Sequence, residues 1–233
     1  MQLDVAAADE AQAAWTHRKC IMSRNLSERK RIHHVHLDAW LHNSTAYGEG
    51  EPMMLRLRPY KACDAAAIVS WSEDEAAFRR WSADRFPAYP ITAEDLNQHY
   101  DAMDGSDSFF EFTAFDDSGP LGHLIMRFTD DEKTTLRFGF VIVDPRKRGQ
   151  GYGREMMNLA VRYAFDFLKV KRITLGVFEN NLPAYRCYRA AGFRETPDCG
   201  TTWYTIGTEN WKCIEMIQTK DQGSFGGKMC TEE

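Results

Sequence analysis

The chain has 233 residues, of which 43% are hydrophobic, 27% are charged and 12% are aromatic. This composition is typical of a soluble globular protein and excludes collagen, a coiled coil and bulk disorder. The 29 Lys and Arg residues face 34 Asp and Glu residues, so the formal net charge is −5. Because binding a polyanion needs a basic surface, the sequence predicts no nucleic-acid partner.

Cysteine usage and hydropathy predict the cellular location of the protein. The six cysteines are scattered without a C-x-x-C pair, which favours reduced thiols over a disulfide scaffold. The N-terminus lacks the basic start and apolar stretch of a secretory signal. No window approaches the ~18 consecutive apolar residues of a membrane span. We therefore predict a cytoplasmic protein without a membrane partner.

Residues 1–52 differ in composition from the rest of the chain. They carry five of the seven histidines but few apolar residues that recur with a period. His33, His34 and His36 are possible metal ligands, but a loose polar stretch lacks the fixed geometry that a metal site needs. We predict a flexible N-terminal extension over 1–52, one domain over 53–220 and a loose tail over 221–233, with no metal.

The first predicted elements are a strand and two helices. Residues 55–58 alternate apolar and basic side chains before Pro59, as a strand with one buried face does. Apolar residues at helical spacing predict a helix over 65–81, with Asp64 as its cap. Thr92 stands three residues before Asp95, which is the pattern of a capping box opening a helix over 92–103.

The middle of the chain is predicted to form strands. Residues 109–115 and 121–128 are apolar runs joined by a turn-forming cluster, which predicts a hairpin. Residues 136–143 are almost continuously apolar, as expected of a strand in the centre of a sheet.

The last third predicts a helix over 151–170, a strand over 173–177, a helix over 182–191 and two strands over 201–206 and 211–218. The whole order predicts an α/β fold with a mixed, mainly antiparallel sheet and helices on both faces.

The turn over residues 143–154 carries the strongest chemical signal. Gly149, Gly151 and Gly153 alternate just before the long helix. Glycines let several backbone N–H groups approach one anion at a positive helix end, so phosphate is the natural ligand, although any strand-to-helix turn can use glycines. A P-loop is excluded because Gly153 is followed by Arg154 and Glu155, and the spacing does not fit the dinucleotide fingerprint.

Two motifs carry a resemblance to a known family. The Arg-x-x-Gly-x-Gly run over 148–153 resembles the acetyl-CoA loop of the GNAT superfamily of N-acetyltransferases. Residues 177–193 are similar to the strand and helix that follow in that family, with Asn181, Ala184, Tyr188 and Gly192-Phe193 in the expected order. The resemblance covers about residues 54–218 and includes features of the branch that acetylates the N-termini of ribosomal proteins.

The resemblance implies acetyl-CoA as co-substrate and a primary amine as acceptor, either a peptide N-terminus or a small amine. Transfer would proceed by direct attack in a ternary complex, with Tyr188 as general acid to the departing thiolate and a backbone N–H polarising the thioester carbonyl. Core packing alone would also justify an aromatic residue at Tyr188, although the surrounding motif favours the functional role, and Asn181 is also a natural helix cap. The implied cofactor-binding residues are Val141, Ile142, Val143, Arg148, Gly149, Gln150, Gly151, Tyr152, Gly153, Arg154 and Asn181.

The general base is left open by the sequence. Many relatives place a glutamate on the central strand where this chain has Arg137, and a guanidinium does not accept a proton at physiological pH. His123, Glu111, Glu179 or a water chain remain as alternatives. The missing base motivates a second hypothesis, an acetyl-CoA-binding sensor or regulatory module with little or no transferase activity. The acceptor stays open among a peptide N-terminus, a polyamine, an aminoglycoside and a small amine metabolite, as does the choice between monomer and homodimer.

Overall fold

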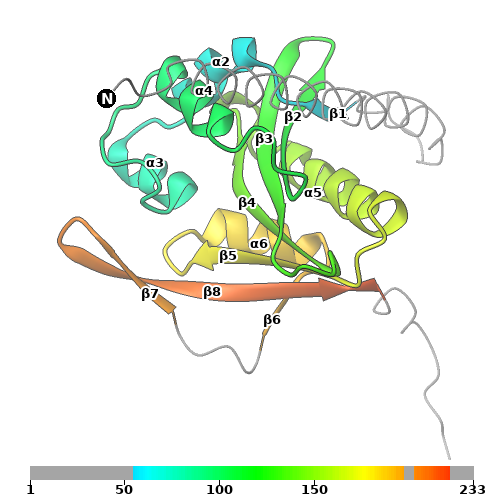
Figure 1. Cartoon of the computed structure of the whole chain (residues 1–233). Helices are drawn as coiled ribbons and strands as arrows, with labels where there is room; N and C mark the ends of the chain where they lie inside the picture. The colour runs from blue at the N-terminus through cyan, green and yellow to red at the C-terminus, as the bar shows by residue number, and fades with distance from the viewer. Residues whose placement is uncertain (1–54, 197–201, 221–233) are drawn as a thin grey trace, which may run out of the picture.

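The computed structural model describes residues 55–196 and 202–220, and these form one eight-stranded sheet with helices on both faces (Figure 1). The strand order is β1-β2-β3-β4-β5-β8-β6, and β7 pairs with β8 outside this path. Every described pair is antiparallel except β4 with β5. The predicted mixed, mainly antiparallel α/β fold is therefore confirmed. The strands are β1 (Arg56–Pro59), β2 (Phe109–Asp116), β3 (Gly119–Phe128), β4 (Thr135–Val143), β5 (Arg172–Phe178), β6 (Arg194–Glu195), β7 (Thr202–Ile206) and β8 (Glu209–Thr219).

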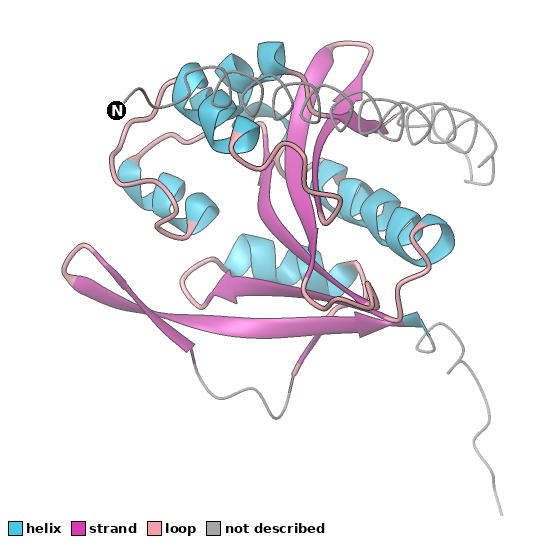
Figure 2. Ribbon diagram, in the orientation of Figure 1, coloured by secondary structure: helices cyan, strands magenta, loops and turns pink. Residues whose placement is uncertain are grey.

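The helices divide between the two faces of the sheet, which Figure 2 shows as cyan ribbons on either side of the magenta strands. One core joins α5 and α6 to the sheet through residues such as Met156, Phe138 and Phe193. The other joins α2, α3 and α4 to the opposite face through Phe78, Leu96 and Phe140. The helices are α2 (Ala65–Ser70), α3 (Glu75–Ser82), α4 (Ala93–Asp101), α5 (Tyr152–Arg162), which continues as a π-helical turn (Tyr163–Phe167), and α6 (Leu182–Ala190).

The single helix predicted over 65–81 is wrong, because the chain breaks between α2 and α3. The Asp74 carboxylate accepts a hydrogen bond from the backbone N–H of Ala77 and so begins a new helix. Asp64 makes no side-chain cap at the start of α2. Its buried carboxylate instead accepts hydrogen bonds from Arg58, at 2.6 Å, and from Thr113, at 2.8 Å.

Most other element predictions agree with the structure. Thr92 and Asp95 form the expected capping box of α4, and β4 lies in the centre of the sheet. The two-residue strand β6 was not predicted, because a strand that short has no periodicity to detect.

The central pair of strands separates along its length. Parallel pairing of β4 with β5 is confined to Thr135–Arg137 and Arg172–Thr174. A bulge then interrupts β4, where Phe140 and Val141 together stand opposite Leu124 of β3. Phe140 has a φ of 48°, in the left-handed region that bulky residues rarely adopt. The two strands therefore diverge beside a locally strained segment of β4.

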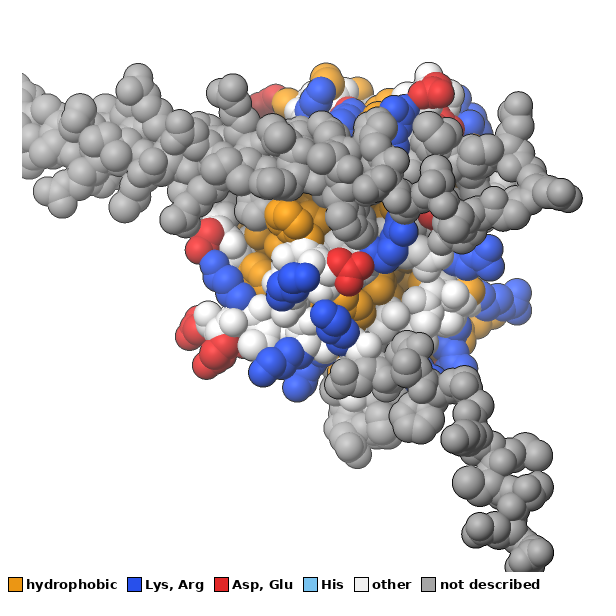
Figure 3. Space-filling model, turned by 90° about the vertical axis from the view of Figure 1, so that its right-hand side faces the viewer, with side chains coloured by type: hydrophobic (Ala, Val, Ile, Leu, Met, Phe, Trp, Pro, Cys, Tyr) orange, Lys and Arg blue, Asp and Glu red, His pale blue; other side chains and the backbone are white. Residues whose placement is uncertain are grey.

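The predicted extension and tail, with the three histidines considered as metal ligands, fall outside the described residues. None of the described helices is long and apolar enough to cross a membrane. On the face shown in Figure 3, basic and acidic side chains are interspersed around smaller hydrophobic areas.

Candidate functional site

A cavity of about 720 Å³ opens where β4 and β5 separate. Its walls come from four parts of the chain: the end of β4, the turn into α5, the start of α6, and the segment from the end of α2 to α3. The lining residues are Trp71, Ser72, Ala77, Arg80, Trp81, Val141, Ile142, Val143, Arg148, Gly149, Gly151, Gly153, Arg154, Asn180, Asn181, Pro183, Ala184, Arg186, Cys187 and Tyr188.

The structure brings nearly all of the candidate site residues to this one cavity. The exceptions are Gln150 and Tyr152, whose side chains bond to neighbouring parts of the protein. The Gln150 amide donates to the carbonyl of Arg146 at 3.0 Å, and the Tyr152 hydroxyl donates to Asp116 at 3.4 Å. Any contact of these two residues with a ligand would therefore come from the backbone.

The glycine turn has the geometry of an anion site. Gly149 has a φ of 75° and Gly151 a φ of 90°, which favour glycine over any other residue. Gly151 is the residue before the first turn of α5, where backbone N–H groups lack partners within the helix. A Cβ atom on Gly153 would lie 3.3 Å from the Cys187 sulfur, so this glycine also permits close packing of α5 and α6. The N-terminus of α5 thus faces the cavity without side chains in the way.

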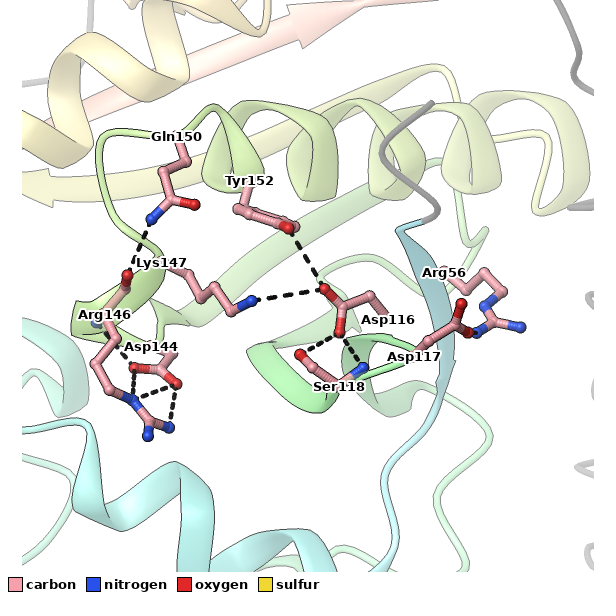
Figure 4. A network of polar contacts seen from close by, with 9 residues as sticks. All are labelled: Arg56, Asp116, Asp117, Ser118, Asp144, Arg146, Lys147, Gln150 and Tyr152. Atoms are coloured by element: carbon pink, nitrogen blue, oxygen red, sulfur yellow. Dashed lines mark hydrogen bonds and ion pairs between the residues drawn. The ribbon is translucent and has the colours of Figure 1, made fainter. Parts of the chain in front are cut away.

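A polar network holds the turn in place (Figure 4). The buried Asp144 carboxylate accepts from the backbone N–H of Arg146 at 2.9 Å and pairs with its guanidinium at 2.7 Å. These hydrogen bonds from Arg146 hold the pKa of Asp144 below its usual range. The Asp116 carboxylate, in the β2–β3 hairpin, accepts a hydrogen bond from the Tyr152 hydroxyl and lies 3.8 Å from the Lys147 ammonium. The turn is therefore anchored at both ends before any ligand binds.

Arg148 joins the turn to the opposite wall of the cavity. Its guanidinium donates to the carbonyl of Trp71 at 3.3 Å and pairs with Glu73 at 3.1 Å. It also donates to the carbonyl of Val143 at 3.2 Å. The loop between α2 and α3 is thereby held against the glycine turn.

Tyr188 lies on α6 with its side chain buried and lines the cavity. Burial, with a smaller contribution from Cys187, raises the pKa of its hydroxyl well above the usual value. The hydroxyl is protonated at neutral pH, as it would be at its ordinary pKa, and burial makes it a weaker acid without removing its ability to donate.

Two further lining residues, Asn181 at the N-cap of α6 and Cys187 within α6, have ordinary structural roles. The Asn181 side chain accepts from the backbone N–H of Ala184 at 3.4 Å, so it caps α6 while also lining the cavity. Burial raises the pKa of the Cys187 thiol, which disfavours the thiolate that a nucleophile would need.

The sequence leaves open whether Trp71 and Trp81 shape a pocket or fill the core, and it does not single out Arg80; all three line the cavity. The indole N–H of Trp81 donates to the carbonyl of Phe140, in the β4 bulge, at 2.9 Å. No motif marks these residues, because their position depends on how the segment from Trp71 through α3 packs against β4. Aromatic residues in an early helix are equally expected of a core.

Arg137 is committed to an ion pair. Its guanidinium makes two hydrogen bonds, of 2.7 and 2.8 Å, to the Glu215 carboxylate on β8. The pair passes over β5 at Gly176, where a Cβ atom would lie 2.9 Å from the Arg137 nitrogen. The hydrogen bonds to Glu215 raise the pKa of Arg137, so this side chain remains a cation.

None of the three proposed bases lines the cavity. His123 is fully buried, its Nε2 lies 2.6 Å from the Tyr100 hydroxyl, and burial lowers its pKa to about 3. Glu179 is exposed and lies 3.7 Å from the Lys212 ammonium. Glu111 stands on β2, two strands away from β4. The described lining therefore offers no carboxylate or imidazole as a base.

Comparison with known proteins places these features in a wider context. The model of the acetyltransferase (GNAT) family matches residues 74–193. A spermine/spermidine N(1)-acetyltransferase of Bacillus subtilis is 38% identical over 52 residues, which are 22% of this chain and 34% of that protein. The match thus spans about a third of that relative's length. An N-acetyltransferase 9-like protein of Caenorhabditis elegans is 21% identical over 159 residues, covering 60% of this chain and 74% of that protein.

Solved structures share the fold. The spermidine N-acetyltransferase of Vibrio cholerae, in complex with CoA and spermine, superimposes with a TM-score of 0.61 at 21% identity. That match covers 71% of this chain and 95% of the Vibrio chain. A phosphinothricin N-acetyltransferase, itself assigned only provisionally, gives a TM-score of 0.57 at 20% identity, covering 71% and 98% of the two chains.

Proposed function

This chain belongs to the acetyltransferase (GNAT) family, and from that premise we propose that it transfers an acetyl group from acetyl-CoA to a primary amine. The observation that carries the proposal is the meeting of the glycine turn, the diverging strands and Tyr188 around one cavity. Separately, each of these features has an ordinary structural explanation.

The turn into α5 is the part of the cavity that fits a diphosphate. Gly149 and Gly151 leave the backbone N–H groups accessible at the positive end of α5. Arg154 lines the cavity beside them and adds a fixed positive charge. Along β4, the backbone of Val141–Val143 borders the gap into which the pantetheine arm would fit. These residues would hold acetyl-CoA, which supplies an activated acetyl thioester.

The chemistry at the other end of the cavity needs a proton donor and an oxyanion donor. As the C–N bond forms, the C–S bond breaks, CoA leaves as a thiolate, and the amine nitrogen loses a proton. The Tyr188 hydroxyl, which is protonated at neutral pH, donates the proton that the thiolate takes up, and it regains a proton from water as the amine loses its own. A backbone N–H of β4 stabilises the negative charge that develops on the carbonyl oxygen.

The proton from the amine leaves by water in this account, because no described carboxylate or imidazole lines the cavity. An acceptor amine that is already neutral when it binds needs no protein base. The rate should then rise with pH up to the pKa of the acceptor amine, with no break that belongs to a protein side chain.

The charge of the cavity bears on the choice of acceptor. The lining holds four arginines, Arg80, Arg148, Arg154 and Arg186, and no Asp or Glu among the described residues. CoA phosphates balance part of this charge, but a polyamine would bring several further positive charges without a carboxylate to meet them. A peptide N-terminus or a small monoamine fits this cavity better than spermidine does.

The test is an assay of amine-dependent CoA release by the full chain with acetyl-CoA. The panel contains short peptides with free N-termini, small monoamines and spermidine. We expect turnover with at least one peptide or monoamine and lower kcat/KM for spermidine. Absence of turnover over the whole panel contradicts the transferase proposal, and a preference for spermidine contradicts the choice of acceptor.

The second candidate is a sensor that binds acetyl-CoA without efficient transfer. It is favoured by the ion pair that occupies Arg137 and Glu215 and by the absence of a described base in the lining. Calorimetric binding of acetyl-CoA without turnover, and a Tyr188→Phe variant that behaves like the parent in every assay, would support it.

A further inference from the structure

The β4 bulge combines strain with a specific hydrogen bond. Phe140 has a φ of 48°, a strained conformation for such a residue that persists only where its surroundings enforce it. The carbonyl of this residue accepts from the indole N–H of Trp81 at 2.9 Å, and the bond is buried. The Trp81 side chain thus bonds to the most unusual peptide group of the strand.

The direction of this hydrogen bond fixes the direction of the N–H group in the same peptide unit, that of Val141. A peptide group is planar and trans, so the carbonyl of Phe140 and the N–H of Val141 point in opposite directions. The carbonyl points toward Trp81 on α3. The N–H of Val141 therefore points away from the Trp81 indole. Val141 itself lines the cavity.

We propose that Trp81 is a positioning residue that aims the Val141 N–H at the carbonyl oxygen of the acetyl thioester. The inference rests on the proposed acetyl transfer. It adds a side chain on α3 that controls the oxyanion donor on β4. Trp81 does not contact the reacting atoms. It holds the peptide plane between Phe140 and Val141 in an orientation that the backbone would not keep without this hydrogen bond.

Packing alone does not account for a tryptophan at this position. The ring lies in an aromatic cluster with centroid distances of 5.9 Å to Phe78, 6.5 Å to Phe86 and 5.5 Å to Phe140. Phenylalanine would serve such a cluster, but it has no N–H donor. The proposal therefore depends on the indole nitrogen and is separable from the volume of the ring.

The experiment replaces that nitrogen while keeping the shape. Trp81 is exchanged for 3-benzothienylalanine, in which sulfur takes the place of the indole N–H, and a Trp81→Phe variant is made alongside. The matched control is Trp211→Phe, because the Trp211 indole N–H also donates a hydrogen bond, at 2.8 Å, but to Glu209 in the β7–β8 hairpin. Thermal unfolding shows whether each variant is folded.

The first readout is the infrared carbonyl stretch of acetyl-CoA labelled with ¹³C at the thioester carbonyl and bound to the protein. A well-aimed N–H lowers this frequency relative to free acetyl-CoA. We expect the lowering in the parent and in Trp211→Phe, and its loss in the benzothienyl protein. This readout requires binding only, so it remains informative if the proposed transfer is wrong.

The second readout is steady-state kinetics. We expect kcat to fall roughly tenfold in the benzothienyl protein, below the full cost of deleting an oxyanion donor. The KM for acetyl-CoA should change less than about twofold, because the diphosphate site is untouched. A folded benzothienyl protein with the parent's carbonyl frequency and kcat overturns the inference, whereas a parent that binds acetyl-CoA without turnover overturns only the transfer.

Discussion

The two ends of the cavity are built in different ways. The glycine turn and the end of β4 lie in one continuous segment, residues 141–154, and their geometry follows from local sequence. The rest of the lining comes from separate elements, chiefly α3 and α6, and Arg137, which does not line the cavity, pairs with Glu215 across 78 positions of the chain. The difference shows that the binding part of the site is encoded locally, whereas the reacting part depends on long-range packing.

The largest expected effect breaks the local end. In Gly151→Glu, a carboxylate enters an anion site and a side chain is forced into a φ of 90°. We expect the Kd for acetyl-CoA to rise more than about 100-fold, near 2.7 kcal/mol. Isothermal titration calorimetry measures it.

Gly105→Glu is the matched control for that variant. Gly105 has a φ of 96°, has nothing within 4 Å of a Cβ position and does not line the cavity. It reproduces the backbone strain and the added charge away from the turn. Equal losses of affinity in the two variants would show that the turn is not the diphosphate site.

The next effect probes the reacting end. Tyr188→Phe keeps the ring in the core and removes the hydroxyl proton donor. We expect kcat to fall roughly 100-fold while the Kd for acetyl-CoA stays within about twofold, as measured by steady-state kinetics and calorimetry. A kcat equal to the parent's would leave Tyr188 as a packing residue.

The same division explains what the sequence could predict. The glycine turn, the Asn181 cap and the order of strands are set by residue types at short spacing, and the structure places them together. The break between α2 and α3 was missed because the Asp74 cap competes with an apolar periodicity that continues through it. The Trp81 bond to Phe140 spans 59 positions, and no local pattern signals it.

The positions of the base candidates, outside the cavity lining, could not be predicted for a related reason. The sequence shows that His123 is able to titrate, but only the fold shows that it is buried against Tyr100. Arg137 was correctly expected to be unable to act as a base. Its partner Glu215 was not foreseen. The ion pair joins side chains on β4 and β8, and it can form only because Gly176 of β5, the strand between them, leaves room.

A smaller effect tests whether the Arg137–Glu215 pair is structural. Glu215→Ala leaves a largely buried guanidinium without its partner, and we expect a loss of about 2 kcal/mol in the free energy of unfolding, below the cost of breaking a fully buried pair. Denaturant titration measures it, and the double variant Arg137→Met/Glu215→Met should recover part of the loss. A stable Glu215→Ala protein that has lost turnover would instead assign Glu215 to the chemistry.

The last prediction concerns His123, and its effect appears only as the pH falls below neutral. Its pKa is about 3 in the folded protein, below the ordinary 6.5, because burial disfavours the charged ring. The unfolded chain therefore takes up this proton first, so the contribution is fully present above pH 6.5 and is lost as the pH falls toward 3. Relative to His123→Asn, the parent should lose up to about 1.4 kcal/mol of stability per pH unit in that window. Parallel pH dependences of the two unfolding free energies would contradict the buried neutral ring.

The most direct measurement compares two ligands that carry the same acetyl thioester. Calorimetric titration of the full chain with acetyl-CoA and with S-acetylpantetheine, which lacks the diphosphate and the nucleotide, isolates what the turn into α5 recognises. The account predicts clear binding of acetyl-CoA and binding of S-acetylpantetheine that is weaker by at least about 100-fold, near 2.7 kcal/mol. Equal affinity for the two ligands, or no affinity for acetyl-CoA, would contradict it.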